Sequence, residues 1–309
     1  MAVLEKTASA RGTGLSLASW VLFGCSGPLA KAVMAAGWSP GEVTAVRIAL
    51  AAGLLLPVVA VLRPGALRFR RRELPLVFGY GLLGVAGVQL FFFVAVARIP
   101  VGVAMVLVNL APALVALWVR VVRRTRLPAL VWAGLALALL GLALVAEFWH
   151  GARLDPVGVA AGLASAACSA GYFLLGEHGA RRHDSFGLTA AGLAIGAVVL
   201  AVVSPPWSAG PLTSTAALGG LRIPVWLLVV VLAAFATAVP YLAGLRALRD
   251  LSSSRASVLA LVEPLVAAVL AWVLLGQALG PVQLAGVVLL LAGAVLVQVA
   301  SSRVLPAPG

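Results

Sequence analysis

The sequence predicts an all-α integral membrane protein with ten transmembrane helices, arranged as two inverted five-helix repeats. Three observations lead to this prediction: an apolar composition, an internal repeat, and the sorting of basic residues between loops. Of the 309 residues, 63% are hydrophobic and only 10% are charged, and the mean hydropathy is +1.13. A soluble domain needs far more polar surface than this. The two repeats are expected to divide the chain into residues 1–148 and 149–309.

Ten apolar stretches are long enough to cross a bilayer. A crossing needs about 20 residues, because the hydrocarbon core is about 30 Å thick and a helix rises about 1.5 Å per residue. The expected bounds are 14–36, 40–62, 74–96, 100–122, 128–146, 156–176, 185–203, 224–247, 252–275 and 280–299. The first stretch follows Lys6 and Arg11, as a signal peptide would. We interpret it as a retained helix, because its Cys25-Ser26 pair matches Cys168-Ser169 in the second half.

The internal repeat is clearest between residues 97–145 and 249–297, which align without a gap. The aligned pairs include Pro112 with Pro264, Gly134 with Gly286 and Gly141 with Gly293. An internal repeat in an almost wholly apolar chain is a common sign of a transporter. Because five is an odd number, two five-helix repeats in one chain must insert in opposite orientations.

The net charge of +13 would suggest nucleic-acid binding in a soluble protein, but here the basic residues sort by membrane side. If the N-terminus is cytoplasmic, the outside segments hold only Arg98, Arg153 and Arg222. The inside segments hold Lys6, Arg11, Arg63, Arg68, Arg70, Arg71, Arg72, Arg120, Arg123, Arg124, Arg126, Arg181, Arg182, Arg246, Arg249, Arg255 and Arg303. Both termini are therefore expected in the cytoplasm of a multi-pass cell-membrane protein, with lipid rather than nucleic acid as the partner of the basic charge.

The loops test the inversion separately. The loop after the fourth stretch carries Arg123, Arg124 and Arg126, whereas the aligned loop 275–278 carries no base. In the opposite sense, the loop after the first stretch has no base, and its mate carries Arg181 and Arg182. Aligned segments thus have opposite charge bias, as inverted topology requires.

The chain resembles the EamA family of ten-helix permeases in the drug/metabolite transporter superfamily. The clearest stretch lies within residues 241–299, with YLAGLRAL followed by SSSRASVLALVEPLVAAVLAWVLLGQALGPVQLAGVVLLLAGAVLV. The resemblance implies export of amino acids or related metabolites, although some relatives import. Many members have Glu just after the fourth and ninth helices. Thr125 and Gln277 stand there in this chain, so no role of those acids carries over.

Glu263 is the one acid expected deep in the membrane, halfway along the ninth stretch. An ionised group there costs about 2.5–3.5 kcal/mol on insertion scales. Glu263 is therefore neutral, paired with a base, or facing a water-filled cavity. The alternative to a functional role is a structural one, in which the acid forms a hydrogen bond to a neighbouring helix. The following Pro264 is expected to break the helix and free the carbonyl of Ala260. Pro112, its repeat mate, is expected to do the same in the fourth stretch.

Two bases lie within expected helices. Lys31 has two readings of equal weight, a substrate contact or snorkelling of its ammonium to the outer headgroups. Arg47 lies deeper, about 10 Å along its helix. Its guanidinium can bind a carboxylate bidentately, either on a substrate or on Glu263 itself.

Further polar candidates for substrate binding or coupling are Asn109, Tyr172 and Tyr241, with Trp20, Gln89 and Thr237 as weaker ones. The competing interpretation for each is hydrogen bonding between helices. The two cysteines are read as small packing residues, and no metal site or cofactor is expected.

The pattern favours a secondary transporter that moves a small polar or amphipathic metabolite by alternating access around a midplane site. The proton is a candidate coupling ion. The sequence has no Walker A motif for ATP-driven transport. An importer of the same fold and a non-transporting scaffold or receptor remain as alternatives. An intramembrane enzyme is disfavoured, because only one acid is deep and no histidine lies in the core.

Overall fold

The computed structural model describes residues 2–96, 98–99, 104, 107–146, 155–275 and 280–302. Gln277, one of the departures from the family pattern, lies outside them. In the first half the helical elements are α1 Ala2–Gly24, α2 Ser26–Ala35, α3 Pro40–Leu62, η1 Pro64–Leu67, α4 Leu74–Gly79, η2 Tyr80–Gly87, α5 Val88–Val96, α7 Ala111–Val121 and α8 Ala129–Ala146. The second half holds α9 Pro156–Arg182, α10 Ser185–Val203, η3 Pro206–Ser208, α11 Val225–Ala233, η4 Ala234–Ala238, α12 Val239–Ala247, α13 Ser253–Leu259, α14 Val262–Leu275 and α15 Pro281–Ser302.

Six helices in the described residues are long and apolar enough to cross a membrane. They are Ala10–Ala35, Pro40–Leu62, Leu74–Ala95, Pro156–Arg182, Ser185–Val203 and Val225–Ala247. The four remaining stretches contain shorter or interrupted helices, among them α7, α8, α13 and α14. The protein is thus a mostly helical integral membrane protein, and crossing at those four stretches stays a prediction.

The expectation of an all-α chain is wrong at one place. Strands β1 (Thr215–Leu218) and β2 (Leu221–Pro224) form an antiparallel hairpin in the long loop before α11. Gly219 and Gly220 join the strands with φ of +58° and +80°, values that glycine adopts at little cost. This is the geometry of a tight two-residue hairpin turn, and its Gly-Gly signal was present in the sequence.

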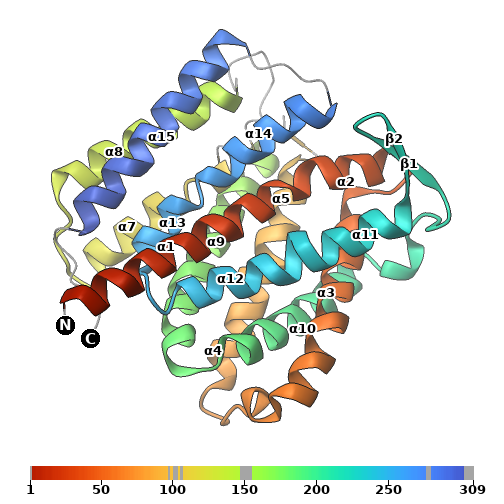
Figure 1. Ribbon diagram of the computed structural model, residues 1–309, viewed down its shortest axis with the longest axis horizontal. Coiled ribbons are helices and arrows are strands. Elements are labelled where there is room, and N and C mark those ends of the chain that lie inside the picture. Colours follow the sequence, from red (N-terminus) through yellow and green to blue (C-terminus); the bar gives the residue numbers. More distant parts are fainter. Residues whose placement is uncertain are drawn as a thin grey trace.

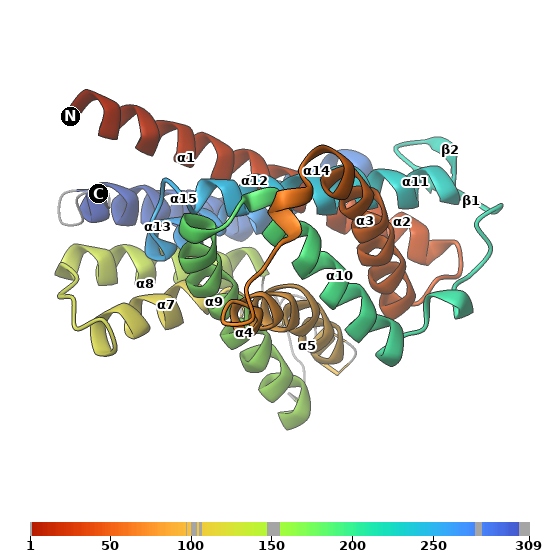
Figure 2. The same ribbon diagram turned by 90° about the horizontal axis from the view of Figure 1, so that it is seen from below.

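Helices of the two halves of the chain pack against each other (Figures 1 and 2). Helix α1 of the first half packs along α12 and α14 of the second half, and α9 of the second half packs along α5 and α7 of the first half. Between them α3 lies against α10, while α8 and α15 lie side by side at one edge of the molecule (Figure 1).

The packing of α8 on α15 is antiparallel and depends on the repeated glycines. A Cβ on Gly141 would collide with the backbone of Gly286 and Leu290, and a Cβ on Gly293 would collide with the backbone of Gly134 and Ala138. Gly141 of α8 therefore meets residues of α15 that precede Gly293, and Gly293 meets residues of α8 that precede Gly141, so the two helices run in opposite directions. Helices that touch backbone to backbone without side chains between them gain van der Waals contact that larger residues forbid.

We expect Gly141→Ala to destabilise the protein, because the added methyl group must push α8 and α15 apart. Overpacking of this kind costs about 1–3 kcal/mol. Gly53→Ala in α3 is the matched control, since a Cβ there meets nothing within 4 Å. Thermal unfolding in detergent measures both variants, and an equal melting temperature for the two would contradict this close packing.

Two apolar stretches are interrupted before the repeated prolines. The break between α13 and α14 precedes Pro264, and α7 begins at Ala111 after a turn at Asn109 and Leu110. The expectation that Pro264 leaves the Ala260 carbonyl free is wrong: that carbonyl accepts a hydrogen bond of 2.9 Å from the N–H of Glu263. The chain tightens by one residue at the break, so the lost bond is replaced locally.

Candidate substrate site

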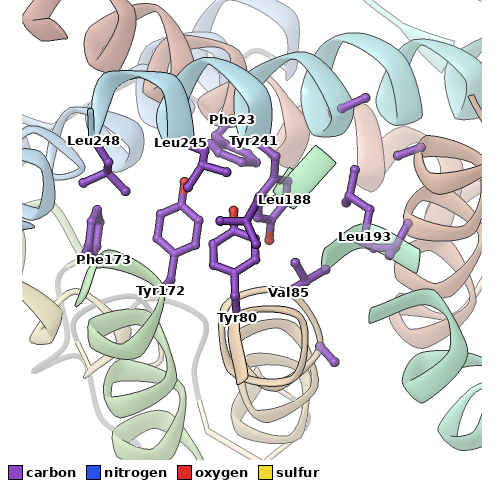
Figure 3. Packing of buried hydrophobic residues seen from close by; sticks show 14 of the residues in the cluster. Phe23, Tyr80, Val85, Tyr172, Phe173, Leu188, Leu193, Tyr241, Leu245 and Leu248 are labelled. Atoms are coloured by element: carbon purple, nitrogen blue, oxygen red, sulfur yellow. The ribbon is translucent and has the colours of Figure 1, made fainter. Parts of the chain in front are cut away.

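An aromatic cluster fills the centre of the molecule. It joins Trp20 and Phe23 of α1, Tyr80 of η2, Tyr172 and Phe173 of α9, and Tyr241 of α12. The ring centroids of Tyr172 lie 5.7 Å from Tyr80 and 5.9 Å from Tyr241, and Phe23 meets Tyr241 edge-on at 5.1 Å. Figure 3 shows Tyr172 and Tyr80 standing side by side below α12, with their hydroxyl ends toward it. The cluster therefore brings both halves of the chain to one centre.

Two of the tyrosine hydroxyls in this cluster are poorly satisfied. The hydroxyl oxygens of Tyr80 and Tyr172 are buried and interact with each other, but neither makes a hydrogen bond of good geometry within the described residues. The Tyr172 hydroxyl lies beside Gly244, where a Cβ would come within 2.8 Å of it. Buried hydroxyls that lack well-placed partners are costly, so they mark a place where a ligand or a water can bind.

Tyr241 is held by the irregular helix Leu74–Ala95, which contains α4, η2 and α5. Its hydroxyl donates to the carbonyl of Gly84 at 3.2 Å, and the side chain of Gln89 also interacts with it. Gly84 lies in η2, a π-helical segment in which the N–H of Val88 reaches the carbonyl of Leu83 instead of that of Gly84. The helix Val225–Ala247 has a π segment too, η4, where the Thr237 hydroxyl donates to the carbonyl of Leu232. Such segments inside α-helices are frequent at functional sites.

Arg47 points into this centre from α3. Its side chain is only 7% exposed, and its Nε is buried with no hydrogen-bond partner. Its electrostatic partners are Tyr241 and Glu263, and within the described residues it forms no ion pair. A buried guanidinium with an unused donor at Nε is energetically costly, and a carboxylate bound there would satisfy it.

Glu263 faces the same centre from the first turn of α14. It is partly buried and lies close enough to Arg47 to interact electrostatically without a direct ion pair. Gly24, at the end of α1, packs beside it, since a Cβ there would lie 3.0 Å from the Glu263 carbonyl. The interruption between α1 and α2 thus lies next to the interruption between α13 and α14. Broken helices that meet near an acid and a base are typical of transporter binding sites.

The other candidates from the sequence fall into two groups, those in the aromatic cluster and those outside it. Tyr172 and Tyr241 belong to the cluster, and so do Trp20 and, through Tyr241, Gln89. Lys31 is exposed on α2, away from the cluster, which agrees with its snorkelling interpretation. Asn109 lies partly buried in the turn before α7, and Thr237 bonds within its own helix.

Sequence reasoning missed a buried acid at the expected inner side. Glu177 in α9 is 5% exposed and binds Arg123 at 3.1 Å, Arg181 at 2.9 Å and the N–H of Ser253 at 3.1 Å. Two more ion pairs at the same expected side join the halves, Arg11 with Asp250 at 3.0 Å and Arg63 with Asp184 at 2.9 Å. In the sequence, the one sign that Glu177 is paired is Arg181, which lies one helical turn after it.

Long apolar helices around a buried centre of aromatic, basic and acidic side chains define a multi-pass membrane protein of the transporter class. The chain belongs to the EamA-like transporter family, whose model matches residues 10–146 and again residues 156–299. This confirms the resemblance found in the sequence.

Curated relatives are transporters as well. The "Threonine/homoserine exporter RhtA" of Escherichia coli strain K12 is 34% identical over 260 residues, which cover 83% of this chain and 80% of that protein. An "Uncharacterized transporter" of Archaeoglobus fulgidus is 28% identical, with 84% and 88% covered. A crystal structure at 20% identity matches with a TM-score of 0.76, covering 95% of this chain and 98% of that one, which shows the shared fold.

Proposed function

We propose that this protein is a secondary transporter that exports small polar or amphipathic metabolites such as amino acids. The observation that carries the proposal is the central site, where Arg47 and Glu263 interact electrostatically without a direct ion pair, beside a tyrosine cluster. An α-amino acid offers one carboxylate and one ammonium group. Arg47 would bind the first, and Glu263 or a nearby carbonyl would bind the second.

The relatives support the direction and the substrate class. A protein 34% identical to this chain is named a threonine/homoserine exporter, and both of those substrates are hydroxyl-bearing amino acids. The buried hydroxyls of Tyr80 and Tyr172 would give such a substrate hydrogen-bond partners, since a hydroxyl donates and accepts. Import by the same fold is the alternative direction.

Transport would proceed by alternating access between two inverted five-helix repeats, residues 1–148 and 149–309. The antiparallel contact of α8 with α15 through paired glycines supports an inverted two-fold relation. The similar partners of α1 and α9 support it too. The three ion pairs that join the halves at the expected inner side would hold that side closed, and opening inward would have to break them.

The other function classes have less support. The curated relatives are named as transporters, which points away from an enzyme. A buried base without an ion pair lowers the stability of the fold. In a scaffold that binds no substrate, nothing would compensate for this cost.

A thermal-stability screen of the purified protein tests the proposal. A ligand that binds the folded state raises the melting temperature. We expect threonine, homoserine or related amino acids to raise it, and the corresponding amides, which lack the carboxylate, to have little effect. The proposal fails if no amino acid stabilises the protein at either pH 6 or pH 8 while an unrelated class of metabolite does.

We predict that both termini face the cytoplasm, because of the distribution of basic residues. In intact cells, Thr213→Cys in the loop before β1 should react with a membrane-impermeant maleimide, and Arg71→Cys before α4 should not. Both positions are exposed, so reactivity reports the side of the membrane. The native Cys25 and Cys168 would be replaced by Ala first. Labelling at Arg71→Cys and not at Thr213→Cys would reverse the proposed orientation.

A further inference from the structure

A basic pocket lies between the loop after α3 and the turn between α9 and α10. Its volume is about 570 Å³, and its walls include Arg63, Arg68, Arg70 and Arg182, with Glu73 and Asp184 as the acids among the described residues that line it. The loop comes from the first half of the chain and the turn from the second. The pocket is separate from the aromatic cluster, since the two share no residue.

The two acids in this pocket are already engaged. Asp184 caps α10 by accepting the N–H groups of Phe186 at 2.8 Å and Gly187 at 3.4 Å, and it also pairs with Arg63. Glu73 accepts the N–H of Arg70 at 2.6 Å. Arg68, Arg70 and Arg182 form no side-chain ion pair within the described residues. Three guanidinium groups therefore remain free to bind an anion.

The walls of the pocket are held in place. The Arg63 guanidinium is fixed by Asp184 and stacks 4.5 Å above the ring of Phe186. Behind it, Gly187 touches the carbonyl of Ala66 so closely that no Cβ fits between them. A site whose side chains are already ordered loses less entropy when a ligand binds.

Exposed apolar side chains adjoin the pocket. Val61 and Leu62, directly before Arg63, are 77% and 74% exposed, and Phe78 on the neighbouring α4 is 54% exposed. In a membrane protein, exposed side chains of this kind near a helix end face the acyl chains. The pocket therefore opens where a charged cavity meets the lipid-facing surface.

We propose that this pocket binds the phosphate headgroup of an anionic phospholipid, with the acyl chains along Val61 and Leu62. Arginine suits this ligand because its planar guanidinium binds phosphate oxygens bidentately, and basic pockets at the cytoplasmic ends of helices attract such headgroups. A lipid bound there would join the α3–α4 loop to the α9–α10 turn and so tie the two halves together. Its placement in the inner leaflet rests on the proposed orientation, whereas the binding itself does not.

Native mass spectrometry of the whole protein with defined lipids tests the proposal. Phosphatidylglycerol is compared with phosphatidylcholine of the same chain length. The pocket variant carries Arg68→Gln, Arg70→Gln and Arg182→Gln, and Arg182→Gln alone is a milder version. The matched control carries Arg71→Gln, Arg72→Gln and Arg126→Gln, which removes equal charge from exposed residues outside the pocket.

We expect the wild type and the control to bind phosphatidylglycerol well in preference to phosphatidylcholine, and the pocket variant to bind it about tenfold more weakly or worse. Millimolar glycerol phosphate should displace little of the lipid, because it lacks the acyl chains. Equal losses in the pocket and control variants would overturn the proposal. So would displacement by glycerol phosphate together with no preference for phosphatidylglycerol, which would indicate a site for a soluble phosphate. Because no transport is measured, the outcome is independent of the proposed export function.

Discussion

Arg47→Gln should weaken amino-acid binding at least about thirtyfold and abolish measurable transport. Loss of one partner of a buried charged hydrogen-bonded contact costs about 2–5 kcal/mol. Arg47 is buried in α3 with an unused donor at Nε, so a substrate carboxylate would be its principal partner. Arg47→Lys should keep part of the affinity, because the charge survives while the planar fork is lost. Equilibrium binding of a radiolabelled substrate measures all three proteins, with the exposed Arg222→Gln as the control.

The structural alternative is a pairing of Arg47 with Glu263 that serves stability alone. In that case Arg47→Gln would strand the acid and destabilise the protein by several kcal/mol. A double-mutant cycle on thermal stability separates the two roles. Strong coupling between the positions, together with equal losses for substrates with and without a carboxylate, would establish the structural role. The absence of a direct ion pair between them in the structure supports the substrate role.

Glu263→Gln should reduce transport about tenfold or more while expression and folding stay near those of the wild type. Glutamine keeps the size and most of the hydrogen bonding of glutamate, but it cannot ionise or carry a proton. If Glu263 couples transport to protons, the variant should also lose the dependence of flux on pH. Intramembrane carboxyls are common members of proton relays. Flux measured at pH 6 and at pH 8 shows whether the variant has lost the pH dependence.

Glu42→Gln is the matched control for Glu263→Gln. Glu42 lies in the capping box at the start of α3, where its carboxylate accepts the N–H of Ser39 at 2.7 Å. Glutamine can make the same bond, so transport should survive. A Glu263→Gln protein with wild-type flux at both pH values would remove this residue as a proton carrier.

Much of the fold could be predicted from periodic and repeated features of the sequence. The long apolar stretches and the glycine pairs depend on local composition, and Pro264 marked a helix interruption that the structure contains. The details of that interruption could not be predicted, because the Ala260 carbonyl found a new donor one residue closer in sequence. The β-hairpin was missed because a hydrophobicity analysis ignores the Gly219-Gly220 turn.

The candidate site was only partly predictable. Arg47 and Glu263 were identifiable as the deep base and the deep acid in a chain with few charges. The aromatic cluster was not, because Phe23, Tyr80 and Tyr172 meet only through the packing of three distant helices. The same reason hid Glu177, whose partners Arg123 and Ser253 lie 54 and 76 residues away in the chain.

Substrate flux in proteoliposomes tests the central claim most directly. Liposomes that contain the wild-type protein, the Arg47→Gln variant or no protein are loaded with labelled threonine and, in parallel, with other labelled amino acids. Efflux is followed with and without a pH gradient. We expect efflux from the wild-type liposomes that saturates with threonine concentration, and efflux from the Arg47→Gln liposomes at the protein-free rate. Equal efflux from wild-type and Arg47→Gln liposomes would contradict a transport site at Arg47. No efflux of any amino acid above the protein-free rate would contradict the proposed function itself.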